Sequence, residues 1–293
     1  MSSDIVQVSE LCYLLPGPAK AGIVKLAEDE VCLIDSGSDK SAARKLRKAL
    51  DAHGWKLRAI YNTHSHADHI GGNQYLQAQT ACRIYAPGIE QAFTCHPVLE
   101  PTFLYGGYPP AALRGKFLMA QASVAEPLTP ATLPPGFELI PLPGHTFDMV
   151  GFRTPDNVVF VADSLASRET LQKYRLCFVH DIAAYLSTLE MLQQLRAALF
   201  IPSHAEPTTE LASLARYNIE QVHAVAELIL ALCAAQPLDF EELLRSLFDS
   251  YTLTLNMEQY VLAGSTLRSF LAWLCDTGRI RPTFHKNKLL WSS

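Results

Sequence analysis

The sequence lacks several features that would assign its class directly. Its seven cysteines contain no CxxC pair, and their odd number and scattered positions argue against a disulfide framework. No apolar run reaches the roughly 18 residues of a membrane-spanning helix, and the start, MSSDIVQVSELCYLLPGP, has no basic segment followed by a long apolar one. We therefore expect a reduced, cytoplasmic protein without membrane contact.

The chain also lacks an excess of positive charge. Its 24 lysines and arginines are outnumbered by 29 aspartates and glutamates, so the net charge of −5 attracts neither nucleic acid nor an anionic membrane. A nucleic-acid function would require a local basic patch. With 293 residues, 49% of them hydrophobic, the chain can form one large domain with an appendage.

Strand and helix patterns alternate early in the chain. Residues 21–37 predict two strands joined by a turn at residues 28–30, with the second strand ending at Asp35. A helical pattern over residues 38–54 precedes a strand over residues 55–64. This order of strand, helix and strand predicts an α/β layered fold.

Residues 87–135 interrupt this alternation with many prolines and the aromatic sequence TFLYGGYPP. Long irregular segments are usually functional, so we expect a cap or lid that faces the substrate. Tyr105 and Tyr108 would either close over the substrate or pack in a rigid turn. Cys95 and His96, just before the aromatic sequence, are further candidates for substrate contact.

Three of the ten histidines stand with an aspartate in the short sequence THSHADH, as His64, His66, Asp68 and His69. A strand that runs into a loop can turn alternate residues to one side, so these side chains can reach two neighbouring metal positions. Imidazole and carboxylate groups suit zinc, and also iron or manganese. Three more candidates each follow a short strand or turn, and these are His145, Asp163 and His204.

The motifs THSHADHIGG, PGHT, ADS and PSHAEP, in this order, resemble the metallo-β-lactamase superfamily over about residues 5–210. The resemblance implies a four-layered αβ/βα sandwich with a two-metal site along one edge, expected to hold two zinc ions. It implies Asp35 in an outer position, where it would orient ligand imidazoles. The implied ligands are His64, His66 and His145 for the first metal, Asp68, His69 and His204 for the second, and Asp163 bridging both.

The resemblance further implies a metal-dependent hydrolase that uses an activated hydroxide, with Asp68 shuttling the proton. An acidic Asp163 resembles the glyoxalase II-like branch, whose members cleave thioesters, lactones or phosphodiesters, with some oxidising persulfides at a single iron. Ala166 stands where a quorum-quenching lactonase would carry tyrosine. A small thioester, ester, lactone or phosphoester therefore remains the expected substrate.

From residue 211 onward the pattern becomes helical, with three helices and a terminal hairpin turning at Lys286 and Asn287. This layout is typical of a winged helix, so we divide the chain into a hydrolase domain, residues 1–210, and a helical domain, residues 211–293. The tail is about neutral, which favours a structural or homodimerisation role over nucleic-acid contact. Two alternatives stay open: a metal-dependent ribonuclease and a non-enzymatic winged-helix ligand sensor.

Overall fold

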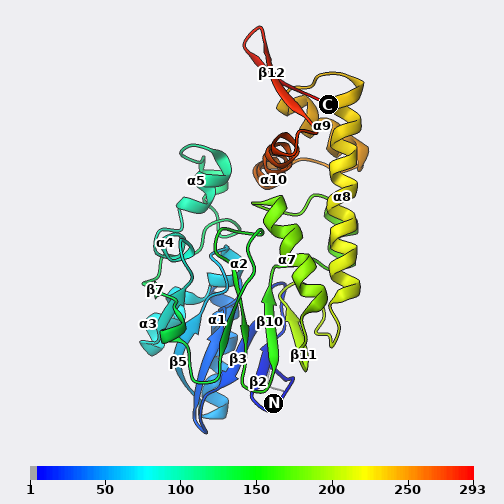
Figure 1. Cartoon of the computed structure of the whole chain (residues 1–293). Helices are drawn as coiled ribbons and strands as arrows, with labels where there is room; N and C mark the ends of the chain where they lie inside the picture. The colour runs from blue at the N-terminus through cyan, green and yellow to red at the C-terminus, as the bar shows by residue number, and fades with distance from the viewer. Residues whose placement is uncertain (1–4) are drawn as a thin grey trace.

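Two β-sheets form the centre of the molecule. The computed structural model describes residues 5–293, and Figure 1 shows both sheets side by side with helices around them. The first sheet has seven strands in chain order: β1 (Val6–Gln7), β2 (Cys12–Leu15), β3 (Ala21–Lys25), β4 (Glu30–Ile34), β5 (Lys56–Tyr61), β6 (Arg83–Ala86) and β7 (Glu126–Pro127). The second has the order β11 (Leu199–Pro202), β10 (Val158–Ala162), β9 (Val150–Arg153), β8 (Glu138–Pro141).

The two sheets pack face to face through apolar side chains. Val24 and Ile34 from the first sheet share a buried cluster with Phe152 and Phe160 from the second. Gly22 makes this contact close, because a Cβ atom at this position would lie 2.4 Å from the ring of Phe160. Strands with alternating apolar residues thus bury their inner faces against each other.

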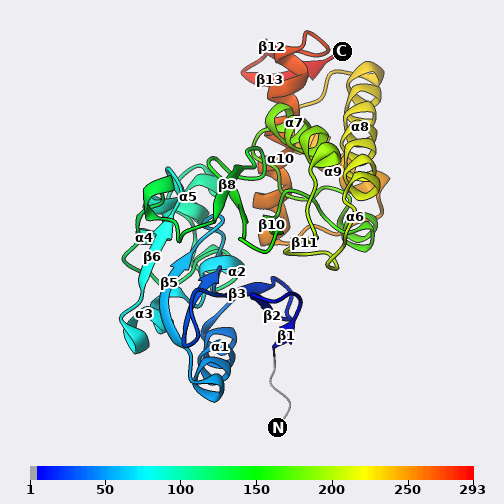
Figure 2. The ribbon, with the colours of Figure 1, turned by 60° about the horizontal axis from the view of Figure 1, so that its bottom comes forward.

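Helices cover the outer face of each sheet. On the first sheet, α1 (Lys40–His53) and α3 (Asn73–Thr80) bury Leu46 and Leu76 in one cluster. On the second, α7 (Ile182–Gln194) and α8 (Ala212–Ala235) form the outer layer, with the short α6 (Arg168–Tyr174) beside α8. Figure 2 shows these helices on opposite sides of the sheets. The predicted four-layered αβ/βα sandwich is confirmed.

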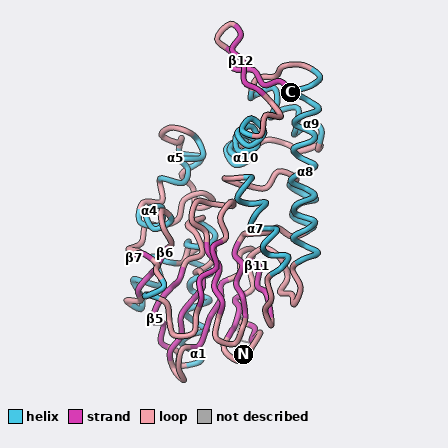
Figure 3. The backbone as a smooth tube through the Cα atoms, viewed as in Figure 1, coloured by secondary structure: helices cyan, strands magenta, loops and turns pink. Residues whose placement is uncertain are grey.

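The segment over residues 87–135 is more regular than its sequence predicts. It contains the short helices α4 (Glu90–Cys95) and α5 (Leu99–Tyr105), which Figure 3 shows as separate turns of helix beside the sheet, and two single 3-10 turns, η1 (Ala111–Leu113) and η2 (Pro130–Thr132). Helices this short show no periodic pattern. Pro101 also obscures α5, although it stands in the first turn, where its missing N–H is not needed.

The C-terminal part has the predicted order of three helices and a hairpin. It comprises α8, α9 (Phe240–Ser250), α10 (Met257–Asp276), β12 (Arg281–His285) and β13 (Lys288–Ser292). Lys286 and Asn287 have positive φ angles of 48° and 62°, as a tight hairpin turn requires. The assignment of this part as a winged helix stays a prediction.

This C-terminal part shares its core with the second sheet. One buried cluster runs from Val161 in β10 through Leu189 in α7 and Ile229 in α8 to Leu247 and Leu267 in the last two helices. The predicted boundary at residue 210 thus coincides with the start of α8 but not with a break in the hydrophobic core.

The helix α8 is long and apolar enough to cross a membrane, by its length and composition alone. It has 24 residues, and its most apolar window has a mean hydropathy of 1.3. Such a helix was not predicted from the sequence, because its apolar residues do not form one uninterrupted run. Core helices of large domains also meet these criteria. Val222, Val225 and Ile229 of α8 lie in the shared core, and 33% of the apolar window is buried, so one face of the helix packs against the rest of the chain.

Candidate metal centre

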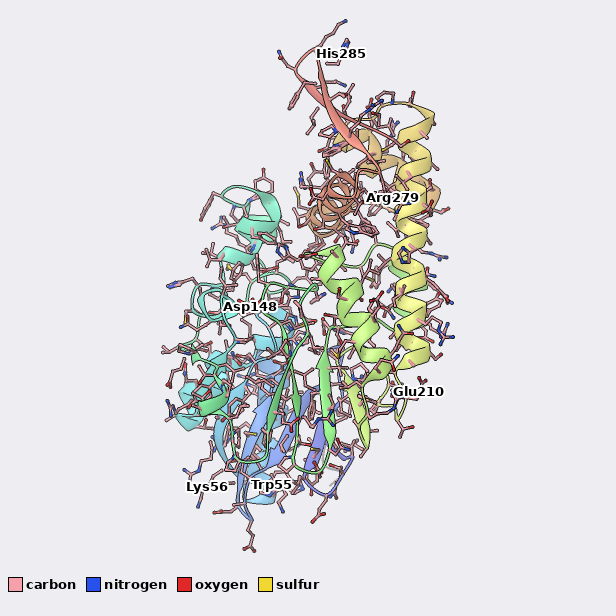
Figure 4. The ribbon with its side chains drawn as sticks, in the orientation of Figure 1. Trp55, Lys56, Asp148, Glu210, Arg279 and His285 are labelled. Carbon is pink, nitrogen blue, oxygen red and sulfur yellow. The ribbon has the colours of Figure 1, made fainter. Side chains whose placement is uncertain are left out.

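The predicted ligands lie at one end of the sandwich, beyond the last residues of four strands. Figure 4 shows Trp55 and Lys56 at the opposite end and Asp148 near the ligand end. After β5 the chain enters the loop that carries His64 and then the single turn of α2 (Ala67–Ile70). Gly72 lets this loop lie against the end of β4, because a Cβ there would lie 2.4 Å from the Ser36 carbonyl oxygen.

The seven side chains form two groups, and Asp163 lies between them. Its Oδ2 is 3.5 Å from His145 Nε2 and 3.1 Å from His204 Nε2. Its Oδ1 is 3.2 Å from His69 Nε2. Within each group the donor atoms lie within 4.8 Å of one another, and the groups are His64, His66, His145 and Asp163, and Asp68, His69 and His204.

Unsatisfied donor atoms indicate that these groups fit cations. His69 Nε2 and Asp163 Oδ1 are buried and approach each other at 3.2 Å as an ion pair, but neither makes a hydrogen bond of regular geometry within the described part of the chain. A buried polar atom left unpaired costs about 1–3 kcal/mol, which a bound cation would offset. Imidazole nitrogens and carboxylate oxygens, with no cysteine among the seven side chains, fit zinc, iron or manganese.

Each of the five candidate imidazoles has a polar contact at one of its ring nitrogens, and each contact comes from a different part of the chain. Such outer partners fix ring orientation and tautomer in metal sites. Asp35, predicted in this role, is buried and has a left-handed φ of 59°, and its Oδ1 accepts a hydrogen bond from the Thr63 N–H at 2.8 Å. The five pairs are His64 Nδ1 with Thr63 Oγ1 at 3.0 Å, His66 Nε2 with Glu100 Oε1 at 3.4 Å, His69 Nδ1 with Asp35 Oδ2 at 2.8 Å, His145 Nδ1 with the Phe178 carbonyl at 3.1 Å, and His204 Nδ1 with the Pro18 carbonyl at 2.6 Å.

Proximity of opposite charges sets the protonation of the metal-free site. The Asp163 carboxylate raises the pKa of His204 to about 10. Burial opposes the charge on His69, yet Asp163 and Asp68 still hold its pKa well above the ordinary value. Burial lowers the pKa of His145 to about 3. At neutral pH the second group therefore carries protons that a cation would displace.

A cavity of about 380 Å³ opens onto both ligand groups. Its wall next to the ligands includes Asp68 and the buried Glu100. The apolar part of its wall comes from three separate parts of the chain, with Phe117 and Leu118 after η1, Phe178 before α7, and Leu262 in α10. The C-terminal part thus contributes directly to the cavity.

The aromatic residues proposed as a lid lie elsewhere. Tyr108 is 74% exposed and its hydroxyl accepts a hydrogen bond from Arg114, while Tyr105 is also exposed. Neither tyrosine, nor Cys95 or His96, lines the cavity. Phe117 is the aromatic side chain of this segment that lines the cavity, and closure of the tyrosine pair over a substrate stays a prediction.

Sequence reasoning also missed two buried glutamates. Glu100 faces His66, and Glu90 accepts hydrogen bonds from the Ser65 N–H at 3.0 Å and the Asp148 N–H at 3.2 Å. Both stand in the segment that had no clear periodicity. Their one signal was a pair of acidic residues among apolar neighbours in a protein with few charges.

This arrangement of two donor groups and a shared aspartate agrees with a family comparison. A sequence profile of the metallo-beta-lactamase superfamily matches residues 14–204. The chain belongs to this superfamily. The profile includes every ligand candidate and Asp35, while the C-terminal helices lie outside it.

Curated relatives within the superfamily match only part of their length. A protein named hydroxyacylglutathione hydrolase from Nitrobacter hamburgensis is 31% identical over 130 residues, which are 44% of this chain and 42% of that protein. One of the same name from Methylobacillus flagellatus is 44% identical over 61 residues, 20% of this chain and 24% of that protein. The chain thus spans less than half of these relatives.

Solved structures share more of the fold. A beta-lactamase domain protein from Burkholderia ambifaria has a TM-score of 0.78 at 17% identity, covering 99% of this chain and 94% of that one. A metallo-beta-lactamase family protein from Thermus thermophilus has a TM-score of 0.74 at 18% identity, with 96% and 98% covered. A metallo-beta-lactamase from Pontibacter korlensis reaches 0.52 at 16% identity and covers 75% of this chain and 98% of that one. Nearly the whole chain, including its C-terminal part, thus has counterparts of the same fold.

Proposed function

We propose that this protein is a two-zinc hydrolase of small thioesters or esters. The observation that carries the proposal is Asp163, placed between two complete donor groups at the floor of a cavity with one apolar wall. Two metal ions in such a site would lower the pKa of a water molecule toward neutrality and supply hydroxide. The named relatives act on hydroxyacylglutathione, a thioester, which supports this substrate class.

The chain's own residues would orient the substrate and move the proton. The apolar wall of Phe117, Phe178 and Leu262 would hold the acyl group against the donor groups. Asp68 lines the same cavity, and its Oδ2 lies 3.3 Å from His204 Nε2. It would accept the proton of the attacking water and pass it to the leaving thiolate. The water oxygen bonds to the acyl carbon, the C–S bond breaks, and an acid and a thiol result.

Elemental analysis of the purified protein, beside a panel of thioester, lactone and bis(p-nitrophenyl) phosphate substrates, tests this proposal. We expect about two zinc ions per chain and thioester turnover that falls at least about a hundredfold in Asp68→Asn, in line with the loss of a positioned proton carrier. One iron per chain with oxygen consumption on persulfides, and no hydrolysis, would contradict it.

The ribonuclease and sensor alternatives have less support. Four basic residues lie in or next to the C-terminal hairpin: Arg279, Arg281, Lys286 and Lys288. Arg279 pairs with Glu227 at 2.7 Å and Lys288 with Asp239 at 3.0 Å, so two of these charges are already neutralised. A sensor would not need the complete donor set. We propose a structural role for the C-terminal part, and a cytoplasmic location, in keeping with the absence of disulfides among the described residues.

A further inference from the structure

We propose that a second groove, next to the metal cavity, binds phosphate groups on the leaving half of the substrate. This groove has a volume of about 420 Å³ and is lined by Lys40, Tyr75 and Lys116 among others. It shares Ser38 and Asp39, and Lys116 as well, with the metal cavity, so the two spaces adjoin. The inference rests on the proposed hydrolysis, because the groove would hold the part of the substrate that leaves.

Cations gather over this groove in a protein that is acidic overall. Lys40 Nζ lies 5.5 Å and Arg44 Cζ 5.9 Å from the centre of the Tyr75 ring. The ring keeps both side chains at the groove through cation–π contacts. Lys116 also lines the groove and pairs with Asp39 at 3.2 Å. The net charge of −5 makes this concentration of cations a local feature.

The helix α1 adds to the positive field. It carries three further cations beyond Lys40 and Arg44, against a single acidic residue, Asp51, which pairs with Arg47 at 2.9 Å. Asp39 is the acidic residue that lines the groove, and it also accepts hydrogen bonds from the Ser41 and Ala42 N–H groups. Lys40 and Arg44 are exposed, and among residues 5–293 neither has an ion pair, so both can meet an anion.

The size and charge of the groove favour one small phosphorylated group. Two lining lysines and Arg44 suit one or two phosphates, because charge-assisted hydrogen bonds to phosphate are strong and need few partners. A nucleic-acid strand requires a longer series of phosphate contacts. We therefore assign the groove to a phosphate-bearing thiol or alcohol, such as a nucleotide-linked thiol, rather than to an oligonucleotide.

Two thioesters that differ only in the leaving thiol test this assignment. The same acyl group is offered on coenzyme A, which carries phosphates, and on N-acetylcysteamine, which carries none. We expect kcat/KM to be at least about tenfold higher for the coenzyme A thioester, as loss of a charge-assisted contact would give. The advantage should shrink as salt is raised, because exposed charges are screened.

Charge reversal shows whether Lys40 and Arg44 produce the preference for the coenzyme A thioester. Lys40→Glu combined with Arg44→Glu should remove the coenzyme A advantage and leave N-acetylcysteamine thioester turnover and bound metal unchanged. Lys45→Glu with Lys48→Glu is the matched control: both lysines are exposed on the same helix, and neither lines the groove or has a cation–π contact with its Tyr75 ring among the described residues. Equal loss in both pairs, or no loss in the first, overturns the inference.

A binding measurement separates this inference from the proposed function. Desulfo-coenzyme A, which has the phosphates but no thiol to bind metal, should bind by calorimetry and lose at least about tenfold in affinity in the Lys40/Arg44 variant. If both thioesters are hydrolysed equally and this ligand does not bind, the hydrolase stands and the groove assignment falls. If no ester is hydrolysed, the proposed function fails. Cleavage of a single-stranded oligonucleotide that depends on Lys40 and Arg44 would overturn the small-molecule assignment.

Discussion

Glu100 shows how much a single buried side chain adds to the site. It is 7% exposed and approaches His66 Nε2 at 3.4 Å, on the side away from the donor atom Nδ1, which lies 3.1 Å from His64 Nε2. A carboxylate in this position fixes the tautomer and raises the basicity of the imidazole. The role of Glu100 is therefore positioning, since its contact is to a ligand candidate.

We predict that Glu100→Gln weakens metal binding by about ten- to a hundredfold, as loss of an outer partner does in other metal sites. Chelator competition measures the affinity, and the visible spectrum of the cobalt-substituted protein should shift because the ligand field at His66 changes. Glu28→Gln, at an exposed turn, is the control. An unaltered spectrum and affinity would show that Glu100 only fills space.

The protonation of His204 gives a second prediction at the residue scale. Its pKa of about 10, against an ordinary 6.5, means that metal binding at pH 7 displaces a proton. Calorimetry of zinc binding in buffers of different ionisation enthalpy should show proton release, and His204→Gln should release fewer protons. Equal release from both proteins would contradict the raised pKa.

The same shift makes the metal-free fold depend on pH. Because the folded pKa of His204 lies above its unfolded value, its contribution to stability is complete below about pH 6.5 and is lost as the pH rises toward 10. Asp163 acts in the opposite direction: burial opposes its charge, yet His204 and His69 hold its pKa well below 3.8, so its contribution is complete above that pH.

At the scale of elements, α4 joins the two loops that carry most of the first ligand group. Glu90, at its start, accepts hydrogen bonds from Ser65 in the loop of His64 and His66 and from Asp148 in the loop of His145. Asp148 in turn accepts one from the Ile89 N–H at 2.8 Å. This segment, expected to be a lid, thus holds the loops of the metal site in place through hydrogen bonds.

Glu90→Ala should therefore lower the free energy of unfolding of the metal-free protein by about 2–4 kcal/mol, because the buried Ser65 N–H and the partly buried Asp148 N–H lose their acceptor. Urea unfolding measures this loss, and zinc affinity should fall in parallel. Glu138→Ala is the control, since Glu138 is exposed in β8. A stable Glu90→Ala protein with weakened zinc binding alone would show that the loops are held by other contacts.

The strands and long helices could be predicted from the sequence because their apolar residues repeat with a fixed period. The grouping of the ligand candidates followed from the same patterns, since polar residues directly after buried strands gather at one edge. Glu90, Glu100 and Phe117 could not be found this way. They stand on short elements, and their proximity to the ligands depends on how those elements fold back, which local periodicity does not encode.

At the scale of the whole molecule, the second sheet and the C-terminal helices share one buried apolar cluster, so we expect the two predicted domains to unfold together. Leu247 and Leu267 are almost fully buried in the cluster that includes β10 and α7. Leu267→Ala in α10 should therefore cost about 2–5 kcal/mol and lower a single unfolding transition, followed both by bound metal and by circular dichroism. Leu255→Ala, at an exposed position, is the control. Two separate unfolding transitions would show instead that the two predicted domains unfold independently.

The order of the ligand candidates along the chain also determines when each donor group becomes complete during synthesis. The ligand candidates run from His64 to His204, and the outer partner of His204 is the carbonyl of Pro18. A growing chain therefore possesses the first donor group only after Asp163 has emerged from the ribosome, and the second only after His204. Because the first group stands on loops that follow strands of both sheets, capture of a metal by the complete group would require the two sheets to have come together.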